Sequence, residues 1–260
     1  MSFISVGQGD GITIENNNQI ISIDGGSTSN SNLSEYILTP NLKARQINTI
    51  NHAFITHADS DHTNGIIGII NNDDVQVENM YLPIFAKENL KYKNIIDTCN
   101  DNNVNIYYLK NGDNIKLNDI EIFVLNPIEN DEFEKKDINE QSLVFILNYK
   151  NLKTMFTGDI GKTAESKILK NTDIDMDVDI LKVAHHGSRN SSLEEFIEII
   201  KPEISIVSSG KNNQYNHPHK ETIDTLNKYN SKIIMTKSSG EIDIILENDE
   251  LEIYEFMIKK

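Results

Sequence analysis

Thr56-His57-Ala58-Asp59-Ser60-Asp61-His62 stands out in this sequence because four of its seven residues are potential metal ligands. The stretch follows an apolar strand predicted over 51–56 and precedes a helix predicted over 63–71, with Thr63 as its cap. On a strand-to-helix loop, side chains converge on one point while the flanking elements stay rigid. Asp and His are also common in turns and caps, but four at this spacing indicate a metal site.

Two further polar groups follow predicted strands in the same way. Asp159 ends Phe156-Thr157-Gly158-Asp159, where a carboxylate is suited to bridge two cations, although Asp is also a favoured helix cap. His185-His186-Gly187-Ser188 follows a strand predicted over 178–184. Adjacent side chains point in different directions, so we expect one of these histidines to bind metal and the other to face substrate.

A third polar cluster is Asn213-Gln214-Tyr215-Asn216-His217-Pro218-His219. His217 is a candidate proton donor or phosphate ligand, and a loop histidine without function is the alternative. The candidate catalytic residues are therefore Asp61, Lys182, His186 and His217. Candidates for binding the substrate are Ser188, Asn213 and Asn216.

The order of predicted elements indicates the architecture. Strand hairpins near 12–23 and 142–157 come first in each half, strand–helix alternation follows, and a polar acidic loop is expected over 127–140. This pattern predicts an α/β fold of two sheets with helices outside. The chain has 260 residues, and we expect one hydrolase domain over 1–260.

Charge and composition limit the partners. The net charge of −16 counts against a tight duplex binder, because neutralised phosphates supply most of the affinity for nucleic acid. The single cysteine, Cys99, excludes an internal disulfide and a cysteine-based zinc cluster. Neither a signal peptide nor a membrane-spanning segment is recognised, so we expect a cytoplasmic location.

The motifs together resemble the metallo-β-lactamase superfamily. His57-x-Asp59-x-Asp61-His62 is similar to its second motif. Similar motifs of one branch, the soluble C-terminal domain of ComEC-type DNA-uptake proteins, occur in the same order: Val6-Gly7-Gln8-Gly9-Asp10, Ile23-Asp24-Gly25-Gly26, Phe156-Thr157-Gly158-Asp159, His185-His186-Gly187-Ser188 and Asn216-His217-Pro218. The resemblance covers nearly the whole chain and indicates a free-standing relative of that domain.

This resemblance implies an αββα four-layer sandwich of two mixed sheets, with two metal ions at the sheet edge. It implies that His57 and Asp59 bind the first ion, and that Asp61 and His62 bind the second. Asp159 would bridge the ions and His185 would complete a coordination shell. Asp24 would orient the ligands, as would Ser142 in the segment Asn139-Glu140-Gln141-Ser142.

The chain departs from the commonest form of the superfamily at the first metal. Asp59 stands where histidine is usual, and no histidine occurs between His62 and His185. Oxygen ligands favour harder ions, so Mn²⁺ is expected over Zn²⁺ among the two candidate metals.

A two-metal site of this kind lowers the pKa of a shared water or hydroxide, which then attacks the substrate. The expected activity is that of a phosphodiesterase or nuclease, with single-stranded DNA or a nucleotide as candidate partners. The alternatives are hydrolysis of a small ester, lactone, thioester, β-lactam or phosphocholine group, and a non-catalytic metal-binding interaction module.

Overall fold

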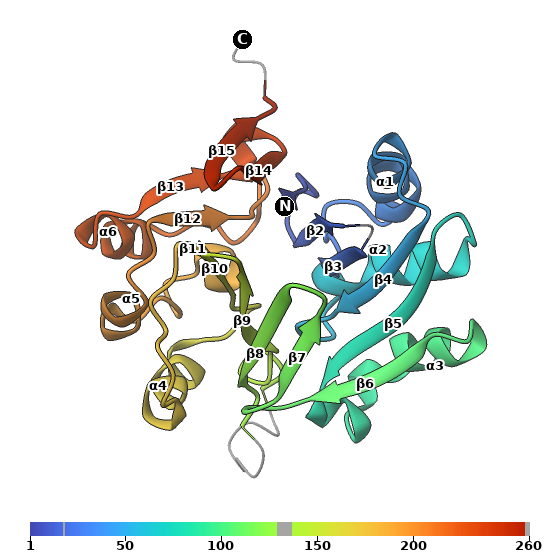
Figure 1. Cartoon of the computed structure of the whole chain (residues 1–260), viewed down its shortest axis with the longest axis horizontal. Coiled ribbons are helices and arrows are strands. Elements are labelled where there is room, and N and C mark those ends of the chain that lie inside the picture. The colour runs from blue at the N-terminus through green and yellow to red at the C-terminus, as the bar shows by residue number, and fades with distance from the viewer. Residues whose placement is uncertain (18, 129–136, 258–260) are drawn as a thin grey trace.

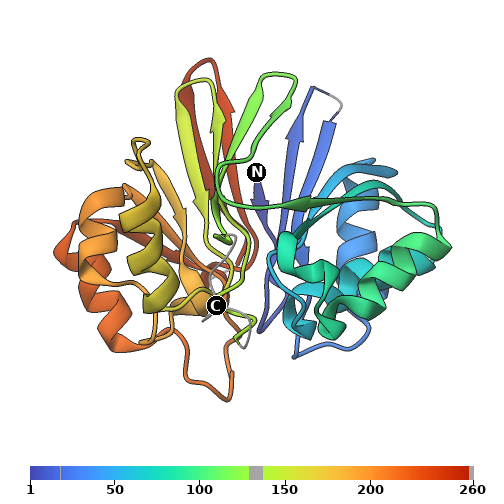
Figure 2. The same ribbon diagram turned by 90° about the horizontal axis from the view of Figure 1, so that it is seen from below.

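The computed structural model describes residues 1–17, 19–128 and 137–257, and most of the loop predicted over 127–140 lies outside them. The described chain forms two mixed β-sheets with helices on their outer faces, which confirms the predicted fold class (Figure 1). Seen from below, the two sheets lie in the middle, with the α4–α6 helices on one side and the α1–α3 helices on the other (Figure 2).

The first sheet has eight strands in the order β15-β14-β1-β2-β3-β4-β5-β6. Strands β3 to β6 are parallel, and the other pairs are antiparallel. The strands are β1 (Ser2–Phe3), β2 (Gly11–Asn16), β3 (Gln19–Gly25), β4 (Thr49–Phe54), β5 (Gln76–Pro83), β6 (Asn105–Leu109), β14 (Ile242–Glu247) and β15 (Glu250–Glu255).

The second sheet has seven strands in the order β13-β12-β11-β10-β9-β8-β7, and its parallel part runs from β10 to β13. The strands are β7 (Asn114–Leu117), β8 (Ile120–Asn126), β9 (Val144–Tyr149), β10 (Leu152–Phe156), β11 (Ile180–Lys182), β12 (Ile204–Val207) and β13 (Lys232–Met235). The predicted hairpins are confirmed as β2–β3 and β9–β10.

Helices cover the outer face of each sheet. Beside the first sheet lie η1 (Ser34–Leu38), α1 (Thr39–Ala44), α2 (Ser60–Asn71), η2 (Ile84–Lys87), η3 (Leu90–Tyr92) and α3 (Lys93–Asp101). Beside the second lie α4 (Lys162–Asn171), η5 (Ala184–Gly187), α5 (Glu194–Ile200) and α6 (Lys220–Lys228), while α7 (Thr236–Ser239) follows β13.

Alternating side chains build three apolar layers, as strand β9 shows. Phe145 and Leu147 point into the core between the sheets, while Val144 and Ile146 pack towards α4 and α5. Both faces of β9 are therefore buried, as expected for a central strand. Side chains pack against both faces of such strands, so the loops at their ends are anchored on rigid elements.

Several element boundaries differ from the sequence prediction, and the strand predicted over 51–56 is β4 (Thr49–Phe54). Helix α2 begins at Ser60 rather than Thr63, with Asp59 as the residue before it, so Asp61 and His62 lie in its first turn instead of in a loop. Strand β11 ends at Lys182 rather than at 184, because the chain turns sharply at His185 and His186.

Candidate metal centre

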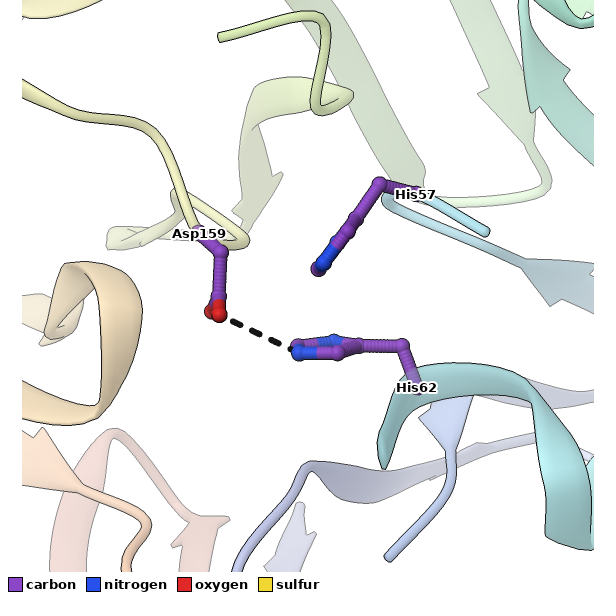
Figure 3. A group of neighbouring side chains, drawn as sticks. All are labelled: His57, His62 and Asp159. Atoms are coloured by element: carbon purple, nitrogen blue, oxygen red, sulfur yellow. Dashed lines mark ion pairs between the residues drawn. The ribbon is translucent and has the colours of Figure 1, made fainter. Parts of the chain in front are cut away.

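Residues from both halves of the chain meet where the strands end. His57 and Asp59 follow β4, and His62 comes from the first turn of α2. Asp159 follows β10 in the other half, and its carboxylate faces the two imidazoles (Figure 3). Gly26 lets α2 approach closely, since a Cβ there would lie 2.3 Å from the backbone nitrogen of His62.

The nitrogen and oxygen atoms of these side chains form close groups that could each hold a metal ion. His57, His62 and Asp159 each offer one atom within 4.8 Å of the others, and so do Asp61, His62 and His186. Asp159 Oδ1 is 3.4 Å from His62 Nε2, and Asp159 Oδ2 is 3.5 Å from His186 Nε2. Asp159 thus lies between two groups of donors, which is the position expected of a bridging carboxylate.

Hydrogen bonds on the far side of each ring indicate which nitrogen is free. His62 Nδ1 lies 2.8 Å from Asp24 Oδ2, and His57 Nδ1 lies 3.1 Å from Thr56 Oγ1, which itself donates to Asp24. His186 Nδ1 lies 3.0 Å from the carbonyl oxygen of Ser208. With Nδ1 as the donor, the neutral form of each buried ring leaves Nε2 free to bind a cation.

Those three Nε2 atoms are the strongest indication of a metal site. The Nε2 atoms of His57, His62 and His186 are buried and have no hydrogen-bond partner, as is also true of Asp159 Oδ1. Unpaired buried polar atoms are costly, and divalent cations bind imidazole nitrogen and carboxylate oxygen. The donor set therefore fits two divalent cations.

The electrostatics of the cluster follow from its carboxylates. Burial lowers the pKa of His57, and neighbouring His62 lowers it further. Burial also lowers the pKa of His62, but Asp159 and Asp24 outweigh this effect and hold it well above its usual range. For Asp159, burial raises the pKa, and the nearby His186 and His62 rings reverse this and hold it well below the usual range. The cluster thus attracts cations.

The two adjacent histidines occupy different environments. Both have left-handed backbone conformations, with φ of 50° at His185 and 53° at His186. His186 is buried, and its Nε2 lies 3.6 Å from Asp61 Oδ2. His185 is 28% exposed, and its Nε2 lies 3.8 Å from Asp159 Oδ2. The resemblance implied His185 as the ligand, whereas this geometry favours His186, because it is His186 that joins the groups of close donor atoms.

Lys182 does not line the cavity beside the candidate ligands, in contrast to its expected role as a proton donor. Its side chain is buried, and Nζ lies 2.7 Å from Asp10 Oδ2 and donates to the carbonyl oxygen of Val183. The other oxygen of Asp10 lies 3.6 Å from His186 Nδ1. Lys182 therefore compensates the charge of a buried carboxylate next to the candidate ligand His186.

A cavity of about 330 Å³ opens above the cluster. Residues from both halves of the chain line it: Gln8, Thr28, Asp59, Ser60, Asp61, Asn139, Asp159, His185, His186, Tyr215 and His217. Burial, with help from His186 and His185, lowers the pKa of His217 to about 4. A neutral His217 ring suits hydrogen bonding to a phosphate better than donating a proton outright.

The expected substrate-binding side chains lie outside this lining. Ser188 is buried, and its Oγ accepts a hydrogen bond from the Asn190 nitrogen. The Asn213 amide donates hydrogen bonds to carbonyl oxygens of its own loop. Asn216 is exposed and has a left-handed backbone conformation. Ser142, expected to orient ligands, accepts a hydrogen bond from the backbone nitrogen of Asp159.

Three residues of the site escaped the sequence analysis as individual candidates. Asp10 was visible only as the last residue of the Val6–Asp10 motif. Thr56 was visible only as the first residue of the stretch Thr56–His62, the ligand heptapeptide. Tyr215 carried no signal beyond its place in a polar cluster. Their roles depend on contacts between distant segments.

Comparison with known proteins gives one family and a set of distant relatives. The model of the metallo-beta-lactamase superfamily matches residues 5–211. ComE operon protein 3 of Bacillus subtilis (strain 168) is 29% identical over 262 residues, which cover 95% of this chain and 33% of that protein. Competence protein ComA of Neisseria gonorrhoeae is 22% identical over 261 residues, which cover 98% of this chain and 34% of that protein. The chain spans about a third of the length of these relatives.

Solved structures share the fold at low sequence identity. The metallo-beta-lactamase fold protein YhfI from Bacillus subtilis superposes with a TM-score of 0.56 and 9% identity, covering 93% of this chain and 98% of that one. Within the described part of this chain, no helix combines the length and the apolar character needed to cross a membrane.

Proposed function

Because the chain belongs to the metallo-beta-lactamase superfamily, we propose that it is a metal-dependent hydrolase of phosphodiester bonds, acting as one unit over 1–260. The observation that carries the proposal is the set of three buried Nε2 atoms that face Asp159 and have no hydrogen-bond partner. His57, Asp59 and Asp159 would hold one cation, and Asp61, His62, His186 and Asp159 the other. Two divalent cations there would lower the pKa of a bound water and stabilise negative charge on the substrate.

The protein's own residues supply orientation. Asp24 fixes His62 directly and His57 through Thr56, so both rings present Nε2 to the same point. Ser142 steadies the turn that carries Asp159. His217 and His185, on the cavity wall, are placed to donate hydrogen bonds to phosphate oxygens. In this division the buried His57, His62, His186 and Asp159 and the more exposed Asp59 and Asp61 would bind metal, while His185 and His217 would face the substrate.

The donors support one choice of metal. His62 belongs to both groups of close donor atoms. Assigned to the second position with His186, it leaves the first position with one imidazole, from His57, and the carboxylates of Asp59 and Asp159. Carboxylate oxygens suit Mn²⁺ and imidazoles suit Zn²⁺. We propose Mn²⁺ as the activating ion, with Zn²⁺ as the competing one.

A phosphodiester substrate is also consistent with the charge of the chain. A net charge of −16 repels polyanions, so the local field must be reversed at the site for a phosphate to approach. Two divalent cations do this where Asp59, Asp61 and Asp159 line the cavity. Activity should therefore depend on added metal more steeply than on ionic strength.

The test is a metal analysis combined with a substrate screen. The purified protein, stripped with chelator and reloaded with Mn²⁺ or Zn²⁺, is offered bis-p-nitrophenyl phosphate, single-stranded DNA, and ester, lactone, thioester, β-lactam and phosphocholine substrates. We expect phosphodiester cleavage with Mn²⁺, abolished in Asp159→Asn and retained in the exposed control Asp97→Asn. Turnover of another class alone would refute the phosphodiester assignment, and bound metal without any turnover would favour an interaction module.

A further inference from the structure

Tyr215 is a large aromatic side chain on the wall of the cavity. It is 47% exposed, although it lies beside the buried ligand cluster. Its ring is stacked on that of His217, with centroids 5.5 Å apart and planes 24° apart. An exposed aromatic ring at the mouth of a polar cavity offers an apolar surface to whatever enters.

The loop that carries Tyr215 is held in shape by Asn213. The Asn213 amide donates to the carbonyl oxygens of Gly210, at 2.8 Å, and His217, at 2.9 Å, and its side-chain oxygen accepts from the His217 nitrogen at 2.8 Å. The two stacked rings are therefore positioned before any substrate binds. A preorganised aromatic surface loses little conformational entropy on binding.

Positive charge accompanies the same loop in an otherwise acidic chain. Lys237 Nζ lies 3.3 Å from the carbonyl oxygen of His217, and Lys211 is exposed at the start of the loop. Lys91 Nζ lies 3.5 Å from Oδ1 of Asp59, another residue of the cavity lining. Lysines of this kind suit a phosphate backbone that continues beyond the scissile group.

We propose that Tyr215 is a specificity-determining residue that stacks on a nucleobase next to the scissile phosphate. This inference rests on the proposed function. Base–aromatic stacking tolerates any base, because every base has a π-face. A duplex holds its bases inside the helix, so only an unpaired strand can place a base on Tyr215 while its phosphate occupies the cavity.

The experiment compares two polymers with identical backbones. One is a single-stranded oligothymidylate, and the other is an oligomer of the same length made of abasic tetrahydrofuran units. The ratio of kcat/KM on the first to that on the second is measured with Mn²⁺ for the wild type, Tyr215→Ala and Tyr215→Phe. Tyr36→Ala is the control, since Tyr36 is 63% exposed and does not line the cavity.

We expect Tyr215→Ala to lower that ratio by about 5- to 100-fold, as expected for loss of one base stack. Tyr215→Phe and Tyr36→Ala should keep the ratio of the wild type, with unchanged metal content in all variants. An unchanged ratio in Tyr215→Ala, or an equal loss in Tyr215→Phe, would overturn the stacking role alone. If the wild type cleaves neither polymer but hydrolyses bis-p-nitrophenyl phosphate, the role of Tyr215 is overturned and the proposed function stands. Failure on all three substrates would overturn the proposed function, and the role of Tyr215 with it.

Discussion

The ammonium of Lys182 lies 2.7 Å from the carboxylate of Asp10, and both side chains are buried beside the candidate metal ligands. The pair joins the N-terminal motif to strand β11, and Asp10 Oδ1 lies 3.6 Å from His186 Nδ1. A buried ion pair contributes little net stability, but it is costly to break on one side.

Asp10→Asn should therefore destabilise the fold strongly. The substitution leaves the Lys182 ammonium buried without its counter-charge, and we expect the free energy of unfolding to fall by about 3–5 kcal/mol. Urea denaturation measures this change. Asp97→Asn is the matched control, because Asp97 forms only an exposed pair with Lys93 on α3, worth about 0.3–0.5 kcal/mol. Equal effects of the two substitutions would contradict the structural role of the pair.

Asp24→Asn should weaken metal binding rather than abolish it. Asp24 accepts hydrogen bonds from the Thr56 nitrogen, the Thr56 hydroxyl and His62 Nδ1, and it has a left-handed backbone (φ 54°) that Asn tolerates. Loss of such a partner lowers metal affinity by about 10- to 100-fold. Competition with a chelating dye measures the affinity.

Substitutions of Thr56 test the role of its hydroxyl separately from that of the Asp24 carboxylate. Thr56→Val removes the hydroxyl that links His57 Nδ1 to Asp24, and it should also lower the affinity. Thr56→Ser keeps the hydroxyl and is expected to bind metal like the wild type. Normal affinity in both Asp24→Asn and Thr56→Val would show that the rings are oriented by other contacts.

Replacing the two adjacent histidines should have unequal consequences. His186→Asn removes a buried Nε2 that lies near both Asp61 and Asp159, so one of the two proposed cations should be lost. His185→Asn removes a partly exposed ring and should preserve the metal content. Asn tolerates the left-handed backbone at both positions, so the comparison isolates the imidazole. Mass spectrometry measures the metal content of both variants. Loss of metal in His185→Asn but not in His186→Asn would identify His185 as the ligand.

The fold and the position of the ligand heptapeptide were predictable from local pattern. An apolar run followed directly by His57, Asp59, Asp61 and His62 places these side chains at a strand end in any fold that buries the strand. The order of hairpins and helices then predicts two sheets with outer helices, as observed.

Other features depend on backbone angles or distant contacts that no local pattern contains. The left-handed conformations at His185 and His186 decide which ring is buried, and nothing in a dipeptide of two histidines encodes that choice. Lys182 resembled a catalytic lysine because its partner, Asp10, precedes β2, far away in the sequence, and meets it only in the folded chain.

His217→Ala should reduce the rate more than the metal content. His217 lines the cavity but belongs to none of the close groups of donor atoms among the described residues. Loss of a hydrogen-bond donor to a developing charge lowers kcat by about 100-fold or more. Because burial and the neighbouring histidines lower the pKa of His217 to about 4, this contribution should be constant above about pH 5. Collapse of the metal content in this variant would identify His217 as a ligand.

Stability should fall with rising pH through Glu165, a buried carboxyl on α4. Burial raises its pKa to about 7, although its two oxygens accept hydrogen bonds from the backbone nitrogens of Ser192 and Leu193. Between the ordinary value of 4.5 and about 7, the folded state holds a proton that the unfolded state has released. The free energy of unfolding therefore decreases as the pH rises through this window, by about 3 kcal/mol in total.

Glu165→Gln cannot titrate and should remove this dependence. Denaturation is measured at several values between pH 4.5 and 7.5 for the wild type, Glu165→Gln and the exposed α5 control Glu198→Gln. The wild type should lose stability relative to Glu165→Gln as the pH rises, while its difference from Glu198→Gln stays flat. Taking differences between variants cancels the titration of the metal ligands, which all three proteins share. A constant difference between the wild type and Glu165→Gln would mean that the two backbone hydrogen bonds keep Glu165 ionised throughout, against the cost of burying its charge.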